Sequence, residues 1–173
     1  MSTDFDKPWS PGAGLTQQIE DVIFDLQMNA SGRTYVDACM KKGPSRKVEG
    51  RRGNALIKFT SIVIGIQVML ESRRGEFPLA VLADADKDTV CFFAQAPALN
   101  LAIKDAHGRV QTTAAYTPDL LVVRRNEIVA LEARDLARLC EQNFKNPYQF
   151  YRDDEGRWHY RAAEEALALL GIT

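Results

Sequence analysis

Two short apolar runs separated by four polar residues constrain the fold of this chain more than any other feature. Residues 120–123 and 128–131 are all aliphatic, whereas 124–127 are all polar. Aliphatic runs of this length are typical of strands, and the polar residues between them favour a turn. The sequence therefore predicts two strands side by side, with the residue before the first and the residue after the second at the same end of the sheet.

Apolar spacing, glycine and proline predict the remaining elements. The expected helices span residues 15–28, 33–41, 75–84 and 162–170, a further helix carries Leu136, Leu139, Cys140 and Phe144 on one face, and two further strands lie at 89–93 and 98–103. Pro78 is expected in the first turn of its helix, since a proline deeper inside would remove a hydrogen bond and clash. The apolar stretch 55–70 fits a strand or a buried helix, and the aromatic stretch 148–160 is expected to be irregular.

This order of helices, strand cluster and helices predicts one α/β domain with a central mixed β-sheet flanked by helices. A chain of 173 residues has about the length of a single domain. Residues 1–14 are rich in proline and glycine and are expected to form a flexible leader, so the domain spans 15–173. Within it, residues 41–54 form a basic connecting segment.

The net charge of −1 conceals a strong asymmetry. Between Lys41 and Arg74 there are nine basic and two acidic residues, a charge of +7, which leaves −8 for the rest. Basic side chains bind the phosphate backbone of double-stranded DNA by releasing condensed counterions. The candidate DNA-binding residues are Lys41, Lys42, Arg46, Lys47, Arg51 and Arg52. The alternative is a solvated basic loop without a partner.

The cysteines and the apolar content predict a cytoplasmic protein. Cys39, Cys91 and Cys140 lack the spacing of metal ligands and are interpreted as reduced thiols in the core. No stretch approaches the roughly 20 apolar residues that span a bilayer, so no membrane is expected as a partner. The polar, acidic first residues do not suit a secretory signal.

Three residues at the expected end of the strand pair suggest a chemical site. Asp119 precedes the first strand, and Glu132 and Arg134 follow the second on one face, because strand side chains alternate. Carboxylates hold Mg²⁺ or Mn²⁺, which polarises a phosphoryl oxygen and lowers the pKa of an attacking water. A neighbouring cation stabilises the charge that develops on the phosphate. The alternative is a turn aspartate with an ion pair at a strand end.

Further motifs extend this pattern along the chain. They are Pro44-Ser45-Arg46-Lys47, Glu76-Phe77, the acidic Asp86 and Asp88, Gln95 followed by Pro97, Thr117-Pro118-Asp119, and Glu132-Ala133-Arg134. In this order they resemble the TnsA family of transposon-end endonucleases over residues 43–171. The resemblance implies a restriction-endonuclease-like core.

The resemblance also implies roles for single residues. Glu76, Asp119 and Glu132 match the metal ligands, with Glu71 as the competing candidate for the position of Glu76. Arg134 stands where the family has its catalytic lysine, and a guanidinium does not replace an amine in every role. Pro78 places Glu76 near its helix start, which changes the direction of its carboxylate.

The function that the resemblance implies is a Mg²⁺- or Mn²⁺-dependent endonuclease that cleaves transposon ends. Its implied partners are a DDE-type transposase of the TnsB kind and an AAA+ regulator. Arg134 favours one alternative, a catalytically silent DNA-binding or assembly subunit of the same fold. A restriction or resolvase-type nuclease is another, and a transposase and an ATPase encoded by neighbouring genes would speak against it.

Overall fold

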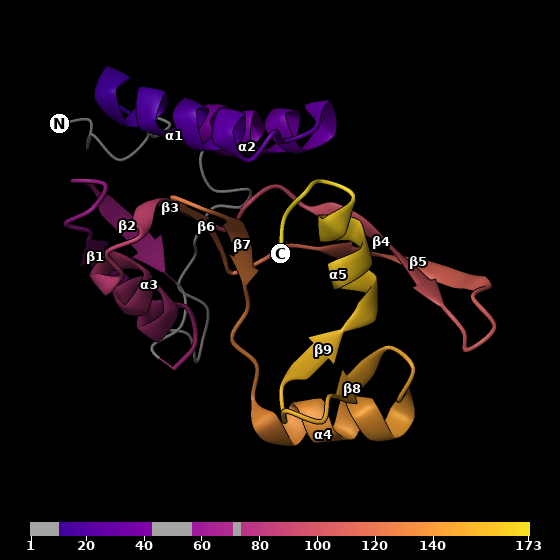
Figure 1. The fold of residues 1–173 in the computed structure, drawn as a ribbon. Helices are drawn as coiled ribbons and strands as arrows, with labels where there is room; N and C mark the ends of the chain where they lie inside the picture. The colour runs from indigo at the N-terminus through magenta and orange to yellow at the C-terminus, as the bar shows by residue number, and fades with distance from the viewer. Residues whose placement is uncertain (1–10, 43–56, 71–73) are drawn as a thin grey trace, which may run out of the picture.

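The computed structural model describes residues 11–42, 57–70 and 74–173, which form the expected α/β fold (Figure 1). The helices are α1 (Ala13–Asp25), α2 (Ala30–Lys42), α3 (Glu76–Ala85), α4 (Leu136–Lys145) and α5 (Arg161–Ala168). The strands are β1 (Ile57–Thr60), β2 (Gln67–Leu70), β3 (Thr89–Ala94), β4 (Leu99–Lys104), β5 (Val110–Tyr116), β6 (Leu120–Arg124), β7 (Ile128–Leu131), β8 (Phe150–Arg152) and β9 (Trp158–Tyr160). None of the helices in these ranges is long and apolar enough to cross a membrane.

The predicted strand pair forms the middle and one side of a three-stranded sheet in the order β3-β6-β7. β6 runs antiparallel to both neighbours, and its second residue, Leu121, pairs with Phe93 of β3 and Ala130 of β7. The amide of Arg124 donates a 2.9 Å hydrogen bond to the carbonyl of Glu127 and closes the expected turn. The prediction of two adjacent strands is therefore confirmed.

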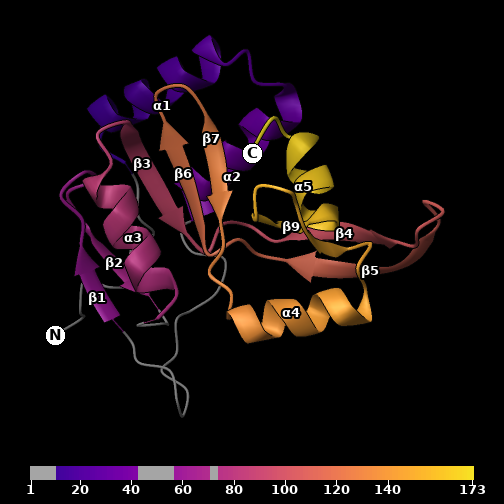
Figure 2. The same ribbon diagram turned by 60° about the horizontal axis from the view of Figure 1, so that its bottom comes forward.

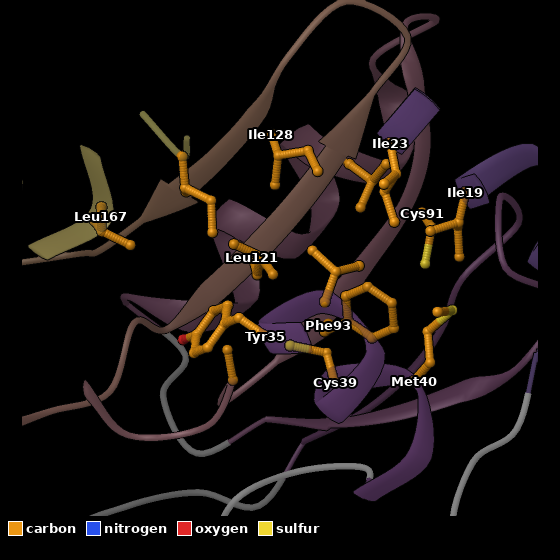
Figure 3. Packing of buried hydrophobic residues seen from close by; sticks show 14 of the residues in the cluster. Ile19, Ile23, Tyr35, Cys39, Met40, Cys91, Phe93, Leu121, Ile128 and Leu167 are labelled. Carbon is orange, nitrogen blue, oxygen red and sulfur yellow. The ribbon is translucent and has the colours of Figure 1, made fainter. Parts of the chain in front are cut away.

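The sheet is covered on both faces, which explains why its strands are almost entirely apolar. Alternate side chains enter two clusters. The first joins α1, α2 and α5 to the sheet through Cys91, Phe93, Leu121, Val123 and Ile128 (Figure 3). The second joins α3 and the β1–β2 hairpin to the opposite face through Phe92, Ala94, Leu120, Val122 and Val129. Figures 1 and 2 show the resulting layers, with α1 and α2 on one side and α3 on the other.

The β4–β5 hairpin and the elements that follow β7 lie beside this sheet (Figure 2). β4 and β5 pair as a long hairpin that extends away from the central strands, and α5 packs along β4. α4 contacts β8 and buries none of its residues. These elements border the end of the sheet where β7 stops.

The expectation that residues 148–160 are irregular is wrong. β8 and β9 form an antiparallel hairpin in which Phe150 pairs with Tyr160. The amide of Asp153 donates to the carbonyl of Arg157 at 2.9 Å, and Gly156 adopts a φ of 84° in the turn. Strands of three residues are too short to produce a period-2 pattern, so the sequence gives no strand signal here.

Residues 57–70 of the apolar stretch 55–70 form a hairpin, which decides between strand and helix for them. Residues 55 and 56 lie outside the described residues. β1 and β2 are antiparallel, and the loop between them is closed by Asp84 of α3. Its carboxylate accepts hydrogen bonds from the hydroxyl of Ser61 and the amides of Ile62 and Val63. Burial alone would raise the pKa of Asp84, but these three hydrogen bonds outweigh it and lower the pKa.

Two boundaries and one cysteine also differ from expectation. α1 begins at Ala13, inside the expected leader, of which residues 1–10 lie outside the described part of the chain. α2 begins at Ala30, earlier than expected, because the side chain of Asn29 accepts a hydrogen bond from its third residue. Cys140 is exposed, because it lies on α4, whereas Cys39 and Cys91 are buried free thiols as expected.

The expectation of a mixed sheet is wrong for the described strands. All strand pairs in the described ranges are antiparallel. The amide of Thr173 donates to the carbonyl of Ile128 at 3.0 Å, and its carbonyl accepts from the amide of Ala130 at 2.7 Å. In a parallel pairing, one residue hydrogen-bonds to the residues before and after its partner. Thr173 bonds in this way to the two residues that flank Val129, so it lies parallel to β7 on the outer side of that strand.

Candidate metal and phosphate site

Asp119 and Glu132 lie side by side at one end of the central sheet. Leu120 at the start of β6 pairs with Leu131 at the end of β7, and one more step of this register places Asp119 opposite Glu132. The Oδ2 of Asp119 accepts a 2.9 Å hydrogen bond from the amide of Ala133, so the two segments stay together beyond the last paired residues. Opposite residues of an antiparallel pair have Cβ atoms about 4.5–5.5 Å apart, which brings the two carboxylates within reach of one ion.

Arg134 is held by two side-chain hydrogen bonds. Its Nε donates to Oε1 of Glu132 at 2.8 Å, and its Nη1 donates to Oε1 of Gln142 on α4 at 3.1 Å. A guanidinium has five N–H groups, so three are left without a side-chain partner among the described residues. The Arg134 side chain is 22% exposed, so these groups lie close to solvent.

The β8–β9 hairpin supplies an aromatic wall for the same guanidinium. The guanidinium carbon of Arg134 lies 5.4 Å from the ring centroid of Phe150 and 5.2 Å from that of Tyr160. These two rings stack on each other at 4.3 Å. A cation this close to aromatic rings is attracted by their quadrupoles. Gln142, Phe150 and Tyr160 are not among the predicted site residues; the only sequence signal for the two rings is the aromatic content of residues 148–160.

Tyr116 connects the buried interior to the site. It is buried at the end of β5, and its ring packs edge-on against Tyr160 at 6.1 Å. Burial raises the pKa of Tyr116 well above its usual range, and the negative charge of Glu132 and a hydrogen bond to it raise the pKa further. The hydroxyl therefore stays protonated beside the Glu132 carboxylate. Its position three residues before Asp119 could have identified it from the sequence.

Glu76 lies at the start of α3, the helix that covers the face of the sheet formed by Phe92, Leu120 and Val122. It is the first residue of α3, is 5% exposed, and belongs to a helix that packs on β3 and β6, with Pro78 in the first turn as predicted. Within the described ranges, no group of three or more His, Cys, Asp or Glu side chains is arranged to hold a metal ion. Asp119 and Glu132 are thus neighbours, while Glu76 does not complete a three-carboxylate cluster with them. Its competitor Glu71 lies outside the described residues.

The donor set at Asp119 and Glu132 fits a hydrated divalent cation. Mg²⁺ is commonly held by one or two carboxylates and keeps several waters. The backbone N–H of Gln95 is hydrogen-bonded to the carbonyl of Asp119. The buried side-chain carboxamide of Gln95 has no hydrogen-bond partner in the described chain. An unpartnered buried polar group calls for a water or an ion. A cation bound to Glu132 has to compete with Arg134 for Oε1.

The candidate DNA-binding residues fall largely outside the described ranges. Arg46, Lys47, Arg51 and Arg52 all do, as does most of the basic connecting segment. Lys41 and Lys42 are the last two residues of α2. The Lys41 side chain is 76% exposed and lies 3.8 Å from the carboxylate of Asp37 one turn earlier. An exposed pair of this kind is weak and leaves the ammonium accessible to a phosphate.

No protein-family model matches this chain, and no curated protein matches it. The resemblance to the TnsA family therefore depends on the order and spacing of the sequence motifs. The geometry adds one independent observation, which is the pairing of Asp119 with Glu132 next to a cationic side chain.

Proposed function

We propose that this protein is a metal-dependent DNA endonuclease with a restriction-endonuclease-like core. The observation that carries the proposal is the juxtaposition of Asp119 and Glu132 at the ends of adjacent strands, with Arg134 bonded to Glu132. Two carboxylates beside a cation are what a divalent metal and a scissile phosphate require. The order of the helix carrying Glu76, β3, β6 and β7 supports the same assignment.

Each side chain of the site has a role in this proposal. A bound Mg²⁺ or Mn²⁺ supplies Lewis-acid polarisation of the phosphate and a lowered pKa for an attacking water. Asp119 and Glu132 would hold it through carboxylate oxygens, with Glu76 as the third ligand that the resemblance implies. The hydroxyl of Tyr116 orients Glu132. Arg134 offers its remaining N–H groups to the non-bridging phosphate oxygens.

The proposed substrate and partners follow from the family resemblance. They are double-stranded transposon ends, a DDE-type transposase of the TnsB kind, and an AAA+ regulator. The basic connecting segment that begins at Lys41 would bind the DNA backbone through phosphate contacts. Cleavage is accordingly expected to depend on the transposase.

Calorimetric titration with Mn²⁺ tests the cation site directly. We expect binding by the wild-type protein and no binding by Asp119→Ala or Glu132→Ala. Glu155→Ala is the matched control, because this carboxylate is 68% exposed, lies in the β8–β9 turn and, among the described residues, forms an ion pair only with Arg157. Binding that survives both site substitutions, or that Glu155→Ala abolishes equally, would contradict the proposal.

A second candidate is a catalytically silent DNA-binding or assembly subunit, and the contacts of Arg134 favour it. Its guanidinium occupies an oxygen of Glu132, and Gln142 and two aromatic rings hold it in place. In this arrangement the cation already neutralises the carboxylate that would bind a metal. A lysine has no planar fork to satisfy Glu132 and Gln142 together.

Arg134→Lys distinguishes the two candidates in a DNA cleavage assay with Mg²⁺ and a TnsB-type partner. The silent-subunit candidate predicts no cleavage by the wild type and a strong gain in the variant. The endonuclease proposal predicts robust wild-type cleavage and no gain. Both proteins should bind DNA with equal affinity, which separates loss of cleavage from loss of binding.

A further inference from the structure

Gln95 is a buried polar residue without a side-chain partner. It follows the last residue of β3 and is 1% exposed. Neither its Nε2 nor its Oε1 has a hydrogen-bond partner in the part of the chain that the structure describes. Burial of an amide without compensating hydrogen bonds destabilises a protein, so such a residue calls for an explanation.

The backbone of Gln95 is also strained. Its φ is 52°, in the left-handed region that residues other than glycine rarely adopt. Gln27 has a similar φ of 50°, but it follows the end of α1, where Met28 donates to the carbonyl of Ile23 and the left-handed residue terminates the helix. Gln95 ends a strand, where no such explanation applies. Strained residues of this kind are concentrated at functional sites.

The position of Gln95 connects it to the candidate cation site. Its amide donates a 3.0 Å hydrogen bond to the carbonyl of Asp119. Ala94 pairs with Leu120, and Leu120 pairs with Leu131. The next step of both registers aligns Gln95, Asp119 and Glu132 in one row across the three strands. The unpartnered side-chain carboxamide thus belongs to the residue next to Asp119, which is in the middle of this row.

We propose that Gln95 is a positioning residue whose carboxamide hydrogen-bonds the water shell of a divalent cation held by Asp119 and Glu132. This inference depends on the proposed function and extends it to a residue outside the set of ligands. A carboxamide both donates and accepts, so it can bind one water as donor and another as acceptor. Groups that orient the surroundings of a metal ion commonly change its affinity 10- to 100-fold when they are removed.

Gln95→Met tests this role, because methionine has nearly the same length and lacks the amide. The left-handed backbone stays equally strained, so the comparison isolates the carboxamide. Thr89→Val is the matched control. Thr89 begins the same strand, roughly 20 Å from Gln95 at the usual rise per residue, and its Oγ1 is also buried without a partner. Both variants remove an unpartnered polar group, Thr89→Val at the start of β3 and Gln95→Met directly after its end.

The measurements are Mn²⁺ affinity by calorimetry and the urea midpoint of unfolding. We expect both variants to unfold at an unchanged or higher urea concentration, and only Gln95→Met to lose Mn²⁺ affinity, by roughly 10- to 100-fold. Wild-type Mn²⁺ affinity in Gln95→Met would overturn the role of Gln95 and leave the cation site intact. Absence of Mn²⁺ binding by the wild-type protein would overturn both.

Gln95→Asn keeps the test decisive if Gln95→Met does not fold. Asparagine adopts the left-handed region more readily than most residues, so this variant should fold. Its carboxamide is set back by one methylene group and no longer reaches the same waters. We expect a folded protein with weakened Mn²⁺ binding, and undiminished affinity would overturn the proposal.

Discussion

His159 is held between two carboxylates, so its charge contributes to stability. Its Nδ1 lies 2.8 Å from Oε1 of Glu164, and its Nε2 lies 2.9 Å from Oδ2 of Asp153. Carboxylates only accept hydrogen bonds, so both nitrogens must carry a proton. The hydrogen bond to Asp153 raises the pKa of His159, burial opposes the increase, and Glu164 adds to it. Arg157, the other charged partner of Asp153, is exposed and competes for the same oxygen.

The raised pKa of His159 predicts a loss of stability as the pH rises above the unfolded pKa of about 6.5. Its pKa in the folded protein exceeds the unfolded value of about 6.5, so the stabilisation is complete below about pH 6.5. It is lost as the pH rises through the folded pKa. Urea unfolding between pH 5.5 and 9 should show this decrease, and His159→Gln should flatten the profile in that window. An identical profile in the variant would show that other groups cause the pH dependence.

At the scale of elements, the start of α2 is attached to the C-terminal segment by a tight contact. The Oδ1 of Asn29 accepts the amide of Gly32 at 2.9 Å, and its Nδ2 donates to the carbonyl of Leu169 at 3.0 Å. A Cβ added to Gly32 would lie 2.0 Å from the carbonyl oxygen of Leu170. Only a residue without a side chain allows these two backbones to approach so closely.

Gly32→Ala is therefore expected to destabilise the protein by about 1–3 kcal/mol. Alanine improves helix propensity by about 0.5–1 kcal/mol, but the clash is with backbone and cannot be relieved by a rotamer change. Gly14→Ala in α1 is the control, because its added Cβ meets nothing within 4 Å. It should be neutral or stabilising by up to about 1 kcal/mol. Equal free energies of unfolding for the two variants, measured in urea, would contradict the assigned contact.

The elements that the sequence predicts correctly are those whose own residue pattern is sufficient to identify them. The aliphatic runs of β6 and β7 and the polar turn between them are sufficient for a hairpin, and Pro78 marks the first turn of α3. β8 and β9 have no such signal, because three residues each do not establish a period. Their pairing depends on a turn around Gly156 and on packing against α4, which is a tertiary effect.

The same distinction applies to the candidate site when the molecule is considered as a whole. Asp119 and Glu132 are neighbours because one short hairpin aligns them, so their pairing could be predicted. The contacts of Arg134 with Gln142 and with the aromatic hairpin depend on where α4 and β8–β9 pack. The position of Glu76 likewise depends on how α3 lies on the sheet. Sequence spacing contains no information on these distances.

Cation binding should stabilise the whole protein if Asp119 and Glu132 form the proposed site. A ligand that binds only the folded state at 100 times its Kd adds about 2.7 kcal/mol to the free energy of unfolding. For a chain of this length, that corresponds to a rise in Tm of roughly 5–10 °C. The measurement is thermal unfolding with and without saturating Mn²⁺, for the wild type, Asp119→Ala and the control Glu155→Ala.

The variants separate a specific site from general screening of acidic charge. Specific binding predicts that the increase in Tm is retained in Glu155→Ala and absent in Asp119→Ala. Diffuse association with the acidic part of the chain predicts similar, smaller increases in all three, because the residues outside 41–74 carry −8. That result would leave Asp119 and Glu132 as structural residues at a strand end, with Arg134 as their permanent counterion, and the silent-subunit candidate would then describe the protein better.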